Sequence, residues 1–315
     1  MKEIGGYFGL EEFTDNSMYS DLIAVNSARN ALIYLMRARK ISKLYIPYYL
    51  CNSVSGVCDR EGYAYEYYNI GEDLLPKFEK KLDDGEYLYV VNYFGQITDE
   101  SIIALKEKHQ NIICDNVQAF FRNPIEGIDT VYSCRKFFGV PDGGYVATDA
   151  KLDTELPVDI SMDRMKHVLG RFEGKSASDY YGDFRENDDA FESLELREMS
   201  KLTRNIMGAV DYSRVKKARE ENFAVLHSML ESQNKLSLKL PEGPYVYPFY
   251  CENGMEIKKA LAAKKIFVPT LWPEVMEMGQ RLEADLAENI LPLPCDQRYG
   301  KTDMERMANE IMQLI

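Results

Sequence analysis

The sequence predicts an α/β protein with a mostly parallel sheet that helices cover on both faces. From about residue 22 to residue 150, short β-rich runs alternate with stretches of helical periodicity. This alternation favours crossover connections, which place ligands at the carboxyl ends of the strands. Beyond residue 190 the pattern is shorter and predicts a smaller α+β domain.

The expected elements are justified in chain order by their runs of apolar residues. Strands are expected at Leu44–Ile46, Tyr63–Tyr67, Tyr87–Val91, Ile112–Cys114, Val131–Ser133 and Tyr145–Ala147, and helices at Ala28–Arg39, Leu75–Leu82 and Asp99–His109. Residues 151–190 are polar, with scattered Gly and Asp, and predict a long irregular excursion.

The remaining third of the chain alternates again. A helical stretch is expected from about Leu194 to Leu230 with a break near Gly208, followed by an apolar run at Tyr245–Cys251, a helix at about Met255–Lys264, a short strand at Ile266–Val268 and a final helix after Thr302. We therefore expect a large domain over residues 1–190 and a smaller one over residues 191–315.

Composition limits the classes of function. The chain has 315 residues, 45% hydrophobic and 28% charged, with a net charge of −13, which excludes disorder and argues against a general binder of nucleic acid or anionic membrane. The six cysteines form no CxxC pair and the three histidines lie far apart, so no metal site is expected. No leader and no apolar run of about 18 residues is found. The sequence therefore predicts a cytoplasmic protein with reduced thiols.

The segment Asn26–Leu32 is the first candidate for a site. Apolar residues precede it, and a helix is expected to begin at Ser27 or Ala28. Serine is a good N-cap, and the free backbone N–H groups of a first helical turn attract anions. Taken alone, the pattern is more often a plain capped helix.

Two further segments carry an acid and an amine. Ile112–Gln118 delivers Asp115 at the end of an expected strand, and Ser133–Gly144 places Lys136 after the next one, beside Phe137 and Phe138. A partly desolvated lysine has a lowered pKa and can form a Schiff base. Each residue alone is more often an ordinary loop aspartate or surface lysine. In this order, however, an anion site, a carboxylate and a lysine match the three needs of pyridoxal phosphate.

The chain resembles the DegT-type sugar aminotransferases, which are fold type I enzymes that depend on pyridoxal phosphate. Ser27–Leu32 is similar to the family's phosphate-binding Ser-Gly-Thr-x-Ala-Leu, Asp115 and Gln118 match its Asp-x-x-Gln, and Ser133, Lys136 and Asp142-Gly143-Gly144 match its Ser…Lys…acidic-Gly-Gly element. Tyr45–Tyr49, Val91–Gly95 and Ile290–Pro294 resemble further family segments, so the likeness covers about residues 22–315.

The resemblance implies a fold and a set of roles. The fold would be a mostly parallel, seven-stranded-type sheet with helices on both faces, plus the smaller domain. Lys136 would hold the cofactor aldehyde and shuttle a proton, and Asp115 would hold the pyridinium N–H. The phosphate contacts would be Ser27, Ala28, Arg29 and Ser133; Gln118 would reach the ring oxygen or the substrate; and Tyr49 or its neighbour Tyr48 would cover the ring.

The implied activity is transfer of an amino group, most simply from glutamate, to a keto sugar that is nucleotide-linked. The implied assembly is a homodimer whose partner completes each site. The aromatic residues of the excursion, Tyr180, Tyr181, Phe184 and Phe191, then belong either to that interface or to local packing.

Several positions depart from the family pattern. Ala28 and Arg29 replace a glycine and a hydroxyl residue, so Arg29 either supplies charge to the phosphate or points into a packed face. Cys51 stands where the ring-stacking aromatic is expected. Leu196 replaces the asparagine that the partner donates, and Asn187 or Arg185 is the nearest substitute. These departures keep an alternative open: a degenerate member that binds the cofactor or a sugar nucleotide without transamination.

Overall fold

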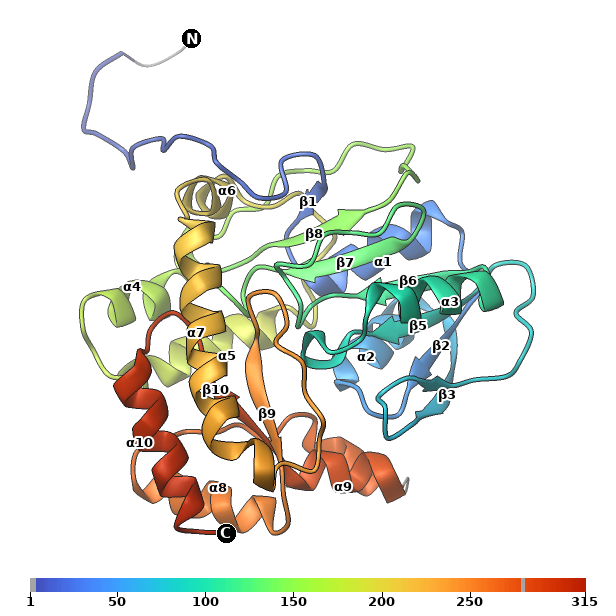
Figure 1. The fold of residues 1–315 in the computed structure, drawn as a ribbon. Helices are drawn as coiled ribbons and strands as arrows, with labels where there is room; N and C mark the ends of the chain where they lie inside the picture. The colour runs from blue at the N-terminus through green and yellow to red at the C-terminus, as the bar shows by residue number, and fades with distance from the viewer. Residues whose placement is uncertain (1–3, 279–280) are drawn as a thin grey trace.

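The computed structural model describes residues 4–278 and 281–315, and its larger sheet runs across the upper right of the view, with the C-terminal helices and the small sheet below and to its left (Figure 1). Within those residues the sheet has eight strands in the order β1-β8-β7-β6-β5-β2-β3-β4. The strands are β1 (Ile23–Val25), β2 (Lys43–Pro47), β3 (Ala64–Ile70), β4 (Pro76–Lys77), β5 (Glu86–Val91), β6 (Ile112–Asp115), β7 (Asp129–Ser133) and β8 (Gly144–Ala147).

The direction of the strands brings many carboxyl ends to one edge. Strands β3, β2, β5, β6 and β7 are parallel along the sheet. Strand β8 is antiparallel to β7 and β1 is antiparallel to β8, so β1 runs in the direction of β7. The predicted mostly parallel α/β sheet is therefore confirmed.

Helices cover both faces of this sheet (Figure 1). Helices α1 (Ala28–Ala38) and α2 (Asn52–Glu61) lie on one face and α3 (Asp99–His109) on the other. Helix α1 buries a continuous apolar stripe that includes Leu32, Leu35 and Met36. At its end Arg39 forms two hydrogen bonds of 2.8 Å with Asp129, which ties α1 to the start of β7.

The helix predicted at Leu75–Leu82 is wrong, because this segment is extended and contains only the short strand β4. Its apolar residue Phe78 packs on Tyr45, with the ring centroids 4.8 Å apart, and Lys80 forms an ion pair with Glu66 on β3. These contacts with the edge of the sheet outweigh the local helical pattern.

The excursion over residues 151–190 is less irregular than the sequence indicates. It contains the helices α4 (Lys166–Phe172) and α5 (Tyr181–Ala190), together with two short 3₁₀ turns. Over its ten residues α5 buries only Asn187, so it lacks the apolar stripe by which an amphipathic helix is recognised.

The last third of the chain packs around a two-stranded antiparallel sheet of β9 (Val246–Tyr250) and β10 (Ile290–Pro294). The helices here are α6 (Lys201–Gly208), α7 (Tyr212–Leu230), α8 (Gly254–Ala263), α9 (Arg281–Asn289) and α10 (Lys301–Met312). The expected break at Gly208 is confirmed, whereas residues 194–200 are not helical.

The strand expected at Ile266–Val268 is wrong, because these residues pair with neither β9 nor β10. Instead Ile266 and Val268 pack on the apolar core between the small sheet and its helices. The alternation of partly buried and exposed side chains in this segment therefore resembles a strand, although its backbone pairs with no strand among the described residues. The division into domains at residue 190 stays a prediction.

Candidate active site

The predicted site residues lie at one edge of the large sheet because each follows a strand that ends there. Asp115 ends β6, Ser133 ends β7, and Ser27 follows β1 by two residues. In the sheet register both Val25 and Ser133 pair with Gly144 of β8. The start of α1 and the Lys136 loop are therefore about two strand spacings apart, roughly 10 Å.

The start of α1 is shaped to receive an anion. Ser27 is buried and extended, and its hydroxyl accepts a hydrogen bond of 3.1 Å from the Asn30 N–H. A Cβ on Gly144 would lie 2.7 Å from the Ser27 carbonyl carbon and 2.9 Å from the Ala28 nitrogen, so glycine allows this close approach. The first-turn N–H groups of Ala28 and Arg29 have no acceptor within the helix.

Asp115 is a buried carboxylate with few donors of its own. Its Oδ2 accepts from the Tyr89 hydroxyl at 2.9 Å and its Oδ1 from the Val117 N–H at 2.8 Å. Burial raises the pKa of Asp115 to about 6, opposed by these two donors and by the positive charge of Lys136. A cation placed against this carboxylate would stabilise its charged form, as a protonated pyridine does.

Lys136 lies close enough to Asp115 to influence that carboxylate, and its side chain is exposed. Its Nζ lies 5.3 Å from the centroid of the Tyr245 ring. The flanking residues Phe137 and Phe138 instead point into a buried aromatic cluster. In this structure, then, the phenylalanines beside Lys136 do not cover its amine, and the lysine is free to reach a ligand.

Ser133 and Gln118 complete this edge. Ser133 is buried and forms no hydrogen bond through its hydroxyl within the described residues. Gln118 is buried, and its Oε1 accepts from the Phe94 N–H at 2.8 Å. That bond fixes the side chain while its Nε2 donates to no residue that the structure describes, so a donor remains for a ligand.

Tyr49 does not suit the role of covering a cofactor ring. Its side chain is completely buried, with ring centroids 5.2 Å from Tyr93 and 4.6 Å from Trp272. Because neither face is accessible, the assignment of Tyr49 is corrected. Tyr48, the other candidate, is half-buried and stacks on Tyr67 at 4.8 Å, and Cys51 is half-buried at the start of α2.

The segment expected to serve a partner subunit is held within its own chain. Leu196 is buried, and the N–H groups of Asn26 and Met199 donate to Arg197 and Ala24 across β1. Asn187 is also buried. Its Nδ2 donates to the Pro141 carbonyl at 3.0 Å, so it cannot replace the missing asparagine in a partner.

Arg185 remains the candidate for such a contact with a partner. It is exposed on α5, where it pairs with Asp189 at 3.3 Å. The neighbouring aromatic residues divide between both expected roles: Tyr181 and Phe184 are exposed, whereas Phe191 is buried in its own chain.

Sequence reasoning missed two supports of the site. Tyr89, on β5, donates to Asp115, and only the pairing of β5 with β6 brings them together. Asp142 is completely buried and accepts from the Ser200 N–H at 2.9 Å, the Ser200 hydroxyl and the Thr203 hydroxyl. It thereby fixes the Lys136 loop to the start of α6. The acidic-Gly-Gly motif marked Asp142, but not its partners.

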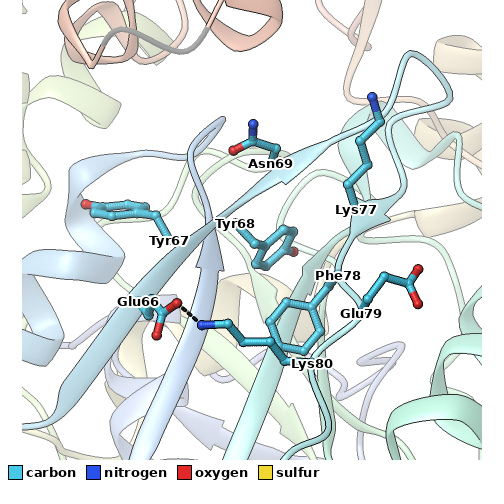
Figure 2. A pocket seen from close by; sticks show the side chains of 8 residues that line it. All are labelled: Glu66, Tyr67, Tyr68, Asn69, Lys77, Phe78, Glu79 and Lys80. Atoms are coloured by element: carbon cyan, nitrogen blue, oxygen red, sulfur yellow. Dashed lines mark hydrogen bonds and ion pairs between the residues drawn. The ribbon is translucent and has the colours of Figure 1, made fainter.

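A separate pocket of about 390 Å³ lies beside β3 and β4 (Figure 2). Its lining residues are Glu66, Tyr67, Tyr68, Asn69, Lys77, Phe78, Glu79 and Lys80. None of the predicted site residues lines it, and its charges are largely paired, as the contact between Lys80 and Glu66 in Figure 2 shows. We therefore keep the site at the carboxyl ends of the strands.

Residues 4–278 and 281–315 hold neither a metal-binding cluster nor a membrane-spanning helix. They contain no group of three or more His, Cys, Asp or Glu side chains arranged to hold a metal ion. They also contain no helix whose length and apolar character would suit it to crossing a membrane.

Comparison with known proteins identifies the fold. No family model and no curated protein matches the sequence. Solved structures do match: an aminotransferase of the DegT/DnrJ/EryC1/StrS type from Brucella abortus is 16% identical, with a TM-score of 0.61 over 93% of this chain and 85% of that one. Helicobacter pylori PseC, an aminotransferase of pseudoaminic acid biosynthesis, is 15% identical, with a TM-score of 0.63 over 93% and 86%.

A third structure carries a cofactor. Bacillus subtilis NtdA with bound PMP is 13% identical, with a TM-score of 0.67 over 93% of this chain and 73% of that one. All three likenesses extend over nearly the whole chain. They confirm that it has the aminotransferase fold which the motifs indicate.

Proposed function

We propose that this chain is a pyridoxal phosphate-dependent aminotransferase that transfers an amino group from glutamate to a nucleotide-linked keto sugar. The observation that carries the proposal is the meeting of Asp115, Lys136 and the start of α1 at one edge of the sheet. The similar structures support it, since they include PseC and a DesI structure determined in the presence of its TDP-sugar product.

The residues present fit this cofactor. The buried carboxylate of Asp115 would hold the protonated ring nitrogen, whose positive charge compensates the cost of burying the carboxylate. Ser27, Ser133 and the N–H groups of Ala28 and Arg29 would bind the phosphate. The free Nε2 of Gln118 would donate to the ring oxygen or to the substrate.

When bound, the cofactor supplies an electron sink and an aldehyde carbon. The exposed amine of Lys136 would hold that carbon at rest. It would then take the proton from Cα of the amino donor and return it on the cofactor side. Asp115 in its charged form would keep the ring nitrogen protonated during this transfer.

The assembly that we propose is a homodimer in the cytoplasm. Apolar side chains of the excursion lie open to solvent: Phe172 is 85% exposed, Tyr181 60% and Phe184 42%. Exposed apolar patches of this kind mark interfaces. All six cysteines are free, which suits a reducing compartment. Arg185 on this surface would reach the partner's site.

Light scattering at micromolar concentration should give about twice the chain mass of 36.3 kDa. Deletion of residues 176–190 should weaken both the dimer and the binding of the cofactor, because the exposed surface is removed. A monomer that binds the cofactor tightly would contradict the shared site.

The chemical test is reduction with borohydride in the presence of pyridoxal phosphate, followed by peptide mapping. The label should fall on Lys136, and Lys136→Ala should lose both the label and all transamination. Lys301→Ala, which changes an exposed lysine at the start of α10, is the matched control. Binding of the cofactor without a label on Lys136 would instead favour the degenerate alternative, and a label on another lysine would overturn the site.

A further inference from the structure

Two guanidinium groups share one buried aromatic ring beside the candidate site. The Cζ of Arg135 lies 4.3 Å from the centroid of the Phe191 ring, and the Cζ of Arg164 lies 5.5 Å from it. Phe191 itself is buried. One arginine comes from the Lys136 loop and the other from the excursion, so the ring holds charges from distant segments together.

Hydrogen bonds connect this pair to the start of α1. The Nη2 of Arg164 lies 2.6 Å from the Oδ2 of Asp159, which also accepts from the Asn26 side chain at 3.3 Å. Asn26 directly precedes the N-cap Ser27. Asp159 therefore links Arg164 to the residue that precedes the N-cap of α1.

Arg29, in the first turn of α1, adds a third positive charge. Burial lowers the pKa of the Arg135 guanidinium, Asp188 opposes this effect, and the charges of Arg29 and Arg164 lower the pKa further. Arg135 therefore lies within electrostatic reach of both Arg29 and Arg164. The sequence left open whether Arg29 supplies charge or points into a packed face, and this arrangement favours charge.

The two aspartates that form ion pairs with this cluster do not balance the three arginines. Asp188 pairs with Arg135 at 3.2 Å, and Asp159 pairs with Arg164. Arg29 forms no ion pair with any residue in the described ranges. One positive charge is therefore in excess, and the dipole of α1 adds to it.

Hydrogen-bond partners are missing in the same place. The Nη1 of Arg164 and the Nδ1 of His167 are buried, and neither has a partner among the described residues. The charge of Arg135 acts on His167, so the two lie close together. Buried polar groups without partners are rare in proteins, and an arginine nitrogen can only donate.

We propose that Arg29, Arg135 and Arg164 form a phosphate site at the start of α1, built from guanidinium groups where the related enzymes use hydroxyls. The site would take a doubly charged phosphate group, either that of the cofactor or one of the substrate. Guanidinium forks bind phosphate oxygens in pairs, which suits this cluster to a dianion. The proposal deepens the proposed function, because the site adjoins the Lys136 loop.

The test is calorimetric titration of the cofactor-free protein with inorganic phosphate at constant ionic strength. Arg29→Gln should weaken phosphate binding tenfold or more, because it removes a charge that no described residue neutralises. The same lack of an internal ion pair means that the substitution should leave the fold intact. Arg171→Gln is the matched control, since among the described residues that exposed arginine of α4 donates only to the Lys175 carbonyl.

A second titration identifies the source of the phosphate. Loss of phosphate binding after loading with pyridoxal phosphate, but not with pyridoxal, assigns the site to the cofactor. Undiminished binding to the loaded protein assigns it to a phosphate of the substrate. Either result supports the site.

Equal affinities of the wild type and Arg29→Gln would overturn the proposal, as would the absence of phosphate binding in the wild type. Because this titration requires no transamination, its result is independent of the borohydride test at Lys136. The site and the proposed function can therefore fail separately.

Discussion

Replacing Asp115 by asparagine should stabilise the cofactor-free protein while impairing its function. Burial raises the pKa of this carboxyl group from 3.8 to about 6. At neutral pH the charged, buried carboxylate therefore lowers the free energy of unfolding. A shift of about two pKa units at 1.36 kcal/mol per unit corresponds to at most about 3 kcal/mol. An amide avoids this cost and keeps both contacts, because its oxygen accepts from Val117 and its nitrogen donates to the Tyr89 hydroxyl oxygen.

The pH dependence gives the sign of the effect. Because the pKa is raised on folding, the folded state binds the proton more tightly, and stability falls as the pH rises from about 4 to about 6. The advantage of Asp115→Asn should therefore be absent near pH 4 and reach roughly 1 to 3 kcal/mol above pH 7. Urea denaturation of both cofactor-free proteins at pH 4 and pH 7.5 measures it. A variant that is less stable at pH 7.5, or a difference that does not change with pH, would refute the reasoning.

A second buried carboxylate provides the contrasting control. Asp142 accepts from the Ser200 N–H and hydroxyl and from the Thr203 hydroxyl, so its charge is well satisfied. Asp142→Asn should lower the free energy of unfolding by about 1 to 3 kcal/mol, since charge-assisted hydrogen bonds are lost. The same urea experiment should thus give opposite signs at the two positions. Stabilisation at both positions would show that removal of charge alone, rather than burial without donors, is responsible.

Two further substitutions test the scaffold. Gly144→Ala should lower the free energy of unfolding by about 1 to 3 kcal/mol in thermal unfolding and weaken phosphate binding, because its Cβ would lie 2.7 Å from the Ser27 backbone. The control Gly56→Ala has open space around it and should be neutral or stabilising. Arg39→Met should lower the free energy of unfolding in urea by about 2 to 4 kcal/mol, because it leaves buried Asp129 without its ion-pair partner. A decrease of less than about 0.5 kcal/mol would contradict this role of Arg39.

The sequence predicts the parts of the molecule that depend on local pattern. Each of the six expected strands of the large sheet is present, because strands buried on both faces are short apolar runs. The positions of Asp115 at the end of β6 and of Lys136 after β7 also follow from chain order alone. Where side chains pack between distant segments, this reasoning fails: Phe78 holds an apparent helix in an extended form.

The same distinction between local pattern and long-range packing applies to the residues of the site. Backbone features such as the Ser27 cap can be predicted, since they depend on neighbouring residues. The burial of Tyr49 against Trp272 cannot, because the two lie more than two hundred positions apart in the sequence. The approach of Arg164 to Asn26 through Asp159 likewise depends on the path of the excursion, which carries little periodic signal.

The reversed strand β8 has a consequence for which substitutions the site can tolerate. Val25 and Ser133 both pair with Gly144, so main-chain hydrogen bonds fix the distance between the helix start and the end of β7, where the lysine loop begins. Side chains at either end can then be exchanged without altering that span. Arg29 at the helix start, for example, can be exchanged while the amine of Lys136 stays in position. The pairing of the strands therefore sets the spacing of the site, and the side chains at its two ends determine which ligand it prefers.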